Sequence, residues 1–242
     1  MKYLLFCPVV LTTGFFWRLF MNQKNQLKKI TVVGMLCAVA YLCMFIFKFK
    51  VSFLTFDFKD AFLATISFMY GPIYSVVSAV LVAFLEFLSV SDTGIYGFIM
   101  NALSSVAFAS TCGLLYKYKH TFNGAVLGAA IAVFFMTAIM LLANWLITPF
   151  YMGVERSQVV SMIPTLLLPF NLIKGIVNMA ITLIIYKPIT TVFKKTGFIS
   201  TGNNTTDKKR FIVITVISII LIVASLLAIF YIFDGSFELV KK

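Results

Sequence analysis

Long apolar runs dominate this chain of 242 residues, and short groups of lysine and arginine separate them. Most runs approach the roughly 20 apolar residues that a helix needs to cross a bilayer. Apolar residues make up 61% of the chain and charged residues 12%, whereas soluble domains carry about a quarter charged residues. Too few polar side chains remain to cover a surface in water. The sequence therefore predicts an all-α polytopic membrane protein, without a nucleic-acid partner despite its net charge of +12.

We expect six crossings in the main domain and one more after it. The apolar run over residues 61–90 is too long for one crossing, and Gly71-Pro72 divides it because proline cannot continue a helix. The expected spans are residues 30–47, 60–70, 73–90, 96–116, 125–147, 164–186 and 211–233.

Lysine and arginine counts set the orientation. Placing the segment before the first span in the cytoplasm puts eleven of these residues inside and six outside; the other three are Lys2, Arg18 and Lys174. The core N-terminus is therefore expected in the cytoplasm.

The chain divides into four expected parts. Residues 1–26 form an N-terminal segment that fits either an extra hydrophobic segment or translation from an upstream start. Residues 27–196 form the membrane domain, and residues 197–210 a basic cytoplasmic linker. Residues 211–242 add a transmembrane helix and a tail.

Catalytic and metal-binding motifs are absent from the sequence. It holds no phosphate-binding P-loop, no zinc-protease motif and no nucleophile elbow, and its one histidine and four scattered cysteines have no metal-ligand spacing. We therefore expect no enzyme, no metal and no cofactor. A self-sufficient secondary transporter stays open as an alternative, although it would need polar groups along a path through the bilayer.

Lys174 lies deep in an apolar run, where a cation should face a cavity or a partner. Asn171 shares its helix face because the two residues are three apart. Asn101 and Asn144 fall at similar depth in the outer half of two other spans. Together they predict an outward-facing pocket for an uncharged ligand rich in hydroxyls and carbonyls. The alternatives are a lysine that reaches the interface and asparagines that bridge helices, as Asn178 is expected to do.

The outer loop after the first span nearly alternates apolar and polar residues from Phe49 to Lys59, which favours extended structure that covers the pocket. Asp60 is placed to cap the second span. Asp57 could bind loop amides or pair with Lys59. In the first span, Gly34 and Ala38 allow close helix contact, either inside the protein or with a partner subunit.

Four segments carry a resemblance to a known family. They are the loop 54–60, the turn Tyr70-Gly71-Pro72, the segment that begins at Asn144-Trp145, and residues 168–175, Leu-Pro-Phe-Asn-Leu-Ile-Lys-Gly. The chain from about Leu27 to Phe193 resembles the substrate-binding S components of energy-coupling factor (ECF) transporters, most closely the riboflavin-specific type.

The resemblance implies a six-helix S-component bundle in the bacterial plasma membrane that captures a vitamin from outside. Its partners would be a transmembrane coupling subunit, docked near Gly34 and Ala38, and two cytoplasmic ATPases. The ligand would be riboflavin, with FMN or another vitamin as alternatives. The implied binding residues are Leu54, Thr55, Phe56, Asp57, Asn101, Asn144, Asn171 and Lys174.

The sequence departs from the family pattern in its third span. Where members often carry a glutamate and a lysine–asparagine pair, this chain has Ala79, Val82 and Ala83. The N-terminal segment and the seventh span are also additions.

Overall fold

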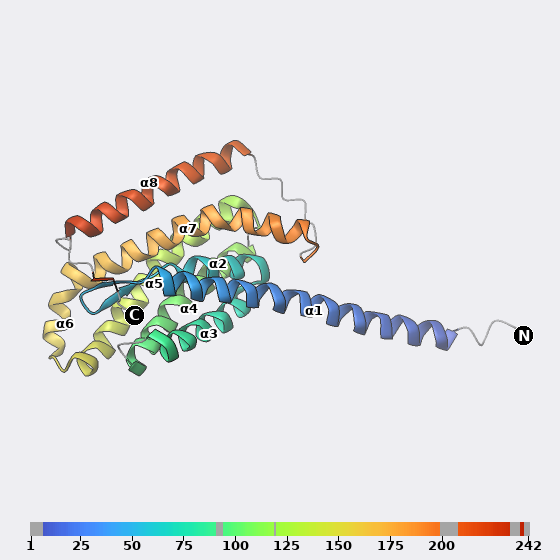
Figure 1. Cartoon of the computed structure of the whole chain (residues 1–242), viewed down its shortest axis with the longest axis horizontal. Coiled ribbons are helices and arrows are strands. Elements are labelled where there is room, and N and C mark those ends of the chain that lie inside the picture. Colours follow the sequence, from blue (N-terminus) through green and yellow to red (C-terminus); the bar gives the residue numbers. More distant parts are fainter. Residues whose placement is uncertain (1–6, 91–93, 119, 199–207, 233–237, 240–242) are drawn as a thin grey trace, which may run out of the picture.

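The computed structural model describes residues 7–90, 94–118, 120–198, 208–232 and 238–239. These residues form a bundle of helices with a small sheet at one end (Figure 1). The helices are α1 (Cys7–Ile46), α2 (Lys59–Tyr70), α3 (Pro72–Val90), α4 (Gly94–Tyr118), α5 (Phe122–Met152), α6 (Arg156–Met162), the π-helix η1 (Ile163–Leu167), α7 (Leu168–Lys195) and α8 (Lys208–Ile232). The strands are β1 (Phe49–Val51), β2 (Leu54–Phe56) and β3 (Glu238–Leu239).

Within the described residues, six helical segments are long and apolar enough to cross a membrane. They match six of the seven expected spans; the remaining one, α2, has only 12 residues. Nine of those 12 are buried, so protein rather than lipid surrounds this short helix. Gly71 ends α2 with φ +98°, a conformation that favours glycine, and α3 begins at Pro72. The predicted break is confirmed.

The N-terminal segment continues into the first span. α1 has 40 residues, about 60 Å of helix, and its N-terminal end projects beyond the bundle (Figure 1). Of the expected linker, residues 199–207 lie outside the described part of the chain, as do residues 1–6 of the N-terminal segment.

The predicted extended loop is a β-hairpin. β1 and β2 pair antiparallel, with Phe49 opposite Phe56 and Val51 opposite Leu54. β3, which follows α8, pairs with the other edge of β1 and gives the strand order β2-β1-β3. The alternation places Val51, Leu54 and Phe56 in the core, since alternate side chains of a strand share a face.

Two glycines allow helices to approach closely. A side chain at Gly113 in α4 would overlap Ser67 of α2, and a Cβ at Gly175 in α7 would lie 2.9 Å from Val133 Cγ1 of α5. Gly34 in α1 meets nothing within 4 Å and is exposed, as is Ala38. The small-residue face of α1 therefore points away from the core of this chain.

α8 lies along the outer side of α7 (Figure 1). Ser218, Ser225 and Ile229 are buried there, and Ile229 joins a core cluster with Phe170 and Val177 of α7. The additional helix is thus packed onto the bundle.

Candidate functional site

A pocket opens at the end of the bundle where the hairpin lies. Its walls come from the hairpin, α4, α5 and α7. Aromatic rings line part of it: Phe53, Tyr96, Tyr151 and Phe170. Polar side chains line the rest: Thr55, Asn101, Ser104, Asn144, Thr148, Asn171 and Lys174. Such a mixture of apolar walls and a few polar groups is typical of small-molecule sites.

Six of the eight residues expected to bind ligand line this pocket: Leu54, Thr55, Asn101, Asn144, Asn171 and Lys174. Phe56 and Asp57 do not. Phe56 points into the core, where its ring lies edge-on to Phe170 with centroids 6.1 Å apart. Asp57 is fully buried behind Lys174. Neither side chain lines the pocket, and Asp57 contacts Lys174, which does.

Lys174 connects the pocket to the hairpin. Its Nζ donates to Asp57 Oδ2 at 3.0 Å and to the Thr55 carbonyl at 3.3 Å. Asp57 also accepts from Lys59, at Oδ2 from Nζ (2.9 Å) and at Oδ1 from the backbone N–H (3.2 Å). Both bonds expected of Asp57, to a loop amide and to Lys59, are present. Burial alone would raise the pKa of the Asp57 carboxyl, but the ammonium groups of Lys174 and Lys59 outweigh it and hold that pKa well below its usual range.

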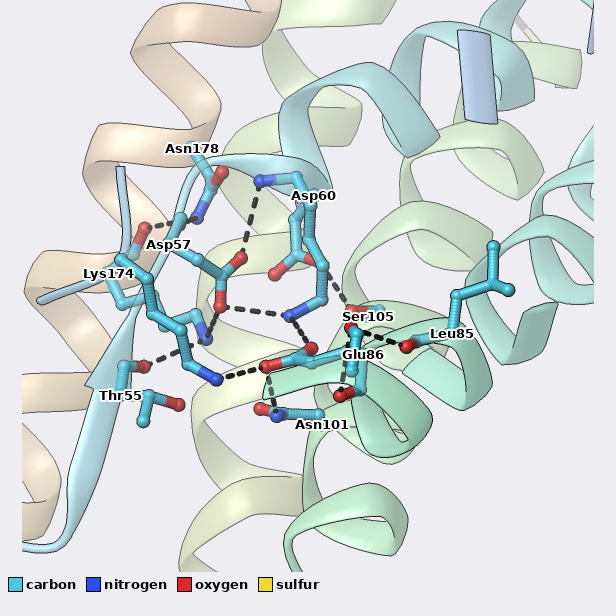
Figure 2. A network of polar contacts seen from close by, with 12 residues as sticks. Thr55, Asp57, Asp60, Leu85, Glu86, Asn101, Ser105, Lys174 and Asn178 are labelled. Carbon is cyan, nitrogen blue, oxygen red and sulfur yellow. Dashed lines mark hydrogen bonds and ion pairs between the residues drawn. The ribbon is translucent and has the colours of Figure 1, made fainter. Parts of the chain in front are cut away.

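Glu86 of α3 extends this pair into a larger group, which we call the buried charge cluster: Lys48, Asp57, Lys59, Glu86 and Lys174. Glu86 Oε1 lies 2.9 Å from Lys48 Nζ and accepts from Asn101 Nδ2 at 3.0 Å, while Oε2 lies 3.1 Å from Lys59 Nζ. Figure 2 shows these contacts between the hairpin, α2, α3, α4 and α7. All five members are less than 10% exposed.

Apart from the Asp57–Lys59 pair, this cluster was not expected from the sequence. Lys48 and Lys59 were predicted to be outer-loop charges and Lys174 the one deep charge, whereas Lys59 and Glu86 are more fully buried than Lys174. The available signal was Glu86, the single charge in the third span. Ala79, Val82 and Ala83, where the sequence departs from the family pattern, are fully buried in the same helix as Glu86.

Asp60 is not the helix cap that we expected. The cap position of α2 is Phe58, and no side chain bonds there. Asp60 lies in the first turn and accepts a 2.5 Å hydrogen bond from Ser105 of α4. Asp60 lies inside the helix and not at its cap position, and its carboxyl binds a hydroxyl of the neighbouring helix instead of the free amides of its own.

The asparagines play different parts. Asn144 and Asn171 each donate to a carbonyl one turn earlier on their own helix, Met140 and Leu167, at 2.8 Å. The interhelical bridge considered from sequence is found at Asn101, which reaches Glu86 of α3. Asn178 instead links α7 to the loop before α2, because it donates to the Asp57 carbonyl at 3.2 Å. Asn144 and Asn171 therefore line the pocket without linking helices through these bonds.

This arrangement, a bundle of membrane helices with a polar pocket near one end under a hairpin, defines a small-molecule-binding membrane protein. The chain belongs to the family of ECF transporter substrate-specific components, which it matches over residues 28–186. It is thus a multi-pass transporter component rather than an enzyme. The family resemblance and the six-helix bundle with an additional C-terminal helix are confirmed.

Two curated relatives and a solved structure serve for comparison. The riboflavin transporter RibU of Staphylococcus aureus (strain TCH60) is 28% identical over 182 residues, which are 71% of this chain and 95% of the relative. The riboflavin transporter FmnP of Bacillus subtilis (strain 168) is 27% identical over 164 residues, or 63% and 86%. The solved S component of a bacterial ECF transporter aligns with a TM-score of 0.60 and 28% identity over 70% of this chain and 99% of that chain.

Proposed function

We propose that this chain is the riboflavin-binding subunit of an ECF importer. The observation that carries the proposal is the pocket itself, in which three asparagines and Lys174 lie among aromatic rings. Flavins combine a flat ring system, ring carbonyls and a chain of hydroxyls, and these groups match aromatic walls and mixed hydrogen-bond donors and acceptors. Both curated relatives are named as riboflavin transporters. Riboflavin is cargo in this proposal, and the chain carries no cofactor of its own.

The charge of Lys174 favours riboflavin over its phosphorylated form, FMN. Of the described lining residues, Lys174 alone carries a charge, and its ammonium already lies 3.0 Å from the Asp57 carboxylate. A phosphate that approached Lys174 would therefore also approach a carboxylate. An uncharged ligand avoids that repulsion and still receives a hydrogen bond from Nζ.

An absorption spectrum of the detergent-purified chain, expressed in cells supplied with riboflavin, tests the proposal. We expect a yellow protein with a flavin spectrum, and chromatography of the released ligand should identify riboflavin. Release of FMN would change the ligand and keep the flavin site. A colourless preparation that also fails to quench the fluorescence of added riboflavin would overturn the proposal.

In this proposal the hairpin end faces outward and the N-terminal end of the membrane domain faces the cytoplasm. The lysine count of the sequence supports that orientation. The importer would also include a transmembrane coupling subunit and two cytoplasmic ATPases. The outward-pointing face of α1 around Gly34 and Ala38 supports docking of the coupling subunit there, because a flat small-residue surface admits a second helix.

Ala38→Leu is therefore expected to leave riboflavin affinity unchanged and to reduce ATP-driven uptake at least tenfold. The added side chain points away from the core and fills the space that a docked helix would occupy. Uptake of labelled riboflavin by vesicles that contain the coupling subunit and ATPases measures this. Ala224→Leu on the exposed side of α8 is the matched control. Normal uptake by both Ala38→Leu and Gly34→Leu would show that this face is not the docking surface.

A further inference from the structure

We propose that Ser104 of α4 is a further ligand-binding residue of this pocket, an inference that rests on the proposed flavin function. Ser104 lines the pocket and is 2% exposed. Its Oγ has no hydrogen-bond partner among the described residues, and none of the other buried side-chain oxygens or nitrogens without a partner in that part of the chain belongs to a lining residue. Buried hydroxyls are nearly always hydrogen-bonded, because burial without a partner is costly. A ligand atom would supply the partner that the protein does not.

Neighbouring hydroxyls show that an unpaired one is unusual here. Ser105, the next residue, donates to Asp60, and Thr148 of α5, another lining residue, donates to Asn144 at 2.9 Å. Successive residues of a helix point about 100° apart. Ser105 therefore faces α2 while Ser104 faces the pocket.

Ser104 lies on the same face of α4 as Asn101, three residues earlier. Asn101 Nδ2 donates to Glu86, so its Oδ1 is the part of the amide left to accept a bond from a ligand. The Ser104 hydroxyl can donate or accept. α4 thus presents two groups one turn apart: the Asn101 Oδ1 acceptor and the Ser104 hydroxyl, which can donate or accept. Such a pair suits a ligand with alternating carbonyl, N–H or hydroxyl groups.

The depth of Ser104 places it at the closed end of the pocket. α4 starts near the mouth, where the rings of Tyr96 and Tyr151 lie 6.3 Å apart, and Ser104 is about two turns further in than Tyr96. Lys174 is the innermost lining residue of α7, as Ser104 is of α4. The inner end of the pocket is therefore bounded by the Ser104 hydroxyl, the Lys174 ammonium and, on α5, the apolar side chain of Met140, so a flavin that fills it can place polar atoms against the first two.

Ser104→Ala is expected to weaken riboflavin binding roughly tenfold, as loss of one buried hydrogen bond would. It should not lower the thermal stability of the ligand-free protein, because the hydroxyl is unpaired there. Ser105→Ala is the matched control: it removes a paired hydroxyl outside the pocket, so it should lower stability and spare affinity. Fluorescence titration gives the affinities and a melting curve gives the stabilities.

The titrations are made with riboflavin and with lumiflavin, which keeps the ring and lacks the hydroxyl chain. Weaker binding of both flavins by Ser104→Ala would assign Ser104 to the ring, and weaker binding of riboflavin alone would assign it to the chain. Unchanged affinity for both, or a clear loss of ligand-free stability, would overturn the inference. Failure of the unmodified protein to bind either flavin would instead overturn the proposed function, and this inference with it.

Discussion

Lys174→Ala is expected to weaken riboflavin binding about 100-fold and to leave the protein folded. A hydrogen bond from a charged group contributes about 1.5–3 kcal/mol, and about 1.4 kcal/mol changes affinity tenfold. Lys174 also holds the wall of the pocket, since its Nζ bonds the Thr55 carbonyl of β2. Both contributions are lost in the variant. Fluorescence titration of the purified proteins measures the change.

The fold should survive because Asp57 keeps a second cation. Lys59 Nζ remains 2.9 Å from Asp57 Oδ2 after Lys174 is removed. Lys195→Ala is the matched control: it removes an exposed lysine from the far end of the same helix, away from the pocket. Equal affinities of Lys174→Ala and Lys195→Ala would exclude Lys174 from the binding site.

The helices and the pocket could be predicted because their signals are local. Span lengths follow from hydropathy, and the break before α3 follows from the covalent ring of Pro72. The pocket could be found because an amide or ammonium in a transmembrane run is rare and must face a polar space. Asn101, Asn144, Asn171 and Lys174 each carry that signal separately.

The buried charge cluster could not be predicted because its signal is distributed over the fold. Glu86 pairs with Lys48 and Lys59, which lie in sequence before and after the hairpin, and no local pattern shows that the three side chains meet. Ser104 had no signal either, since only the rotation of α4 distinguishes it from Ser105. The wrong assignment of Asp60 has another cause: α2 begins at Lys59, one residue earlier than expected, so Asp60 lies inside the helix, and its partner Ser105 is 45 residues away.

The cluster holds three ammonium groups and two carboxylates, and the contacts among them allow these charges to remain buried. Lys59 lies at its centre: it is completely buried and contacts both Asp57 and Glu86. Without Lys59, the remaining ammonium groups Lys48 and Lys174 would each pair with one carboxylate at the periphery. The two carboxylates would then face each other with no cation between them.

Lys59→Met is therefore expected to destabilise the protein by about 3–5 kcal/mol, as removal of one partner from a buried ion pair does. That corresponds to a melting temperature lower by about 10 °C for a chain of this size. Size-exclusion chromatography of the heated, detergent-purified protein measures this melting temperature, with Lys195→Met as the exposed control.

The double variant Lys59→Met, Glu86→Gln removes one charge of each sign, so it should be more stable than the sum of the single effects predicts. Strictly additive losses would show that the two side chains do not stabilise each other, and that helix packing, not charge pairing, holds α2 against α3.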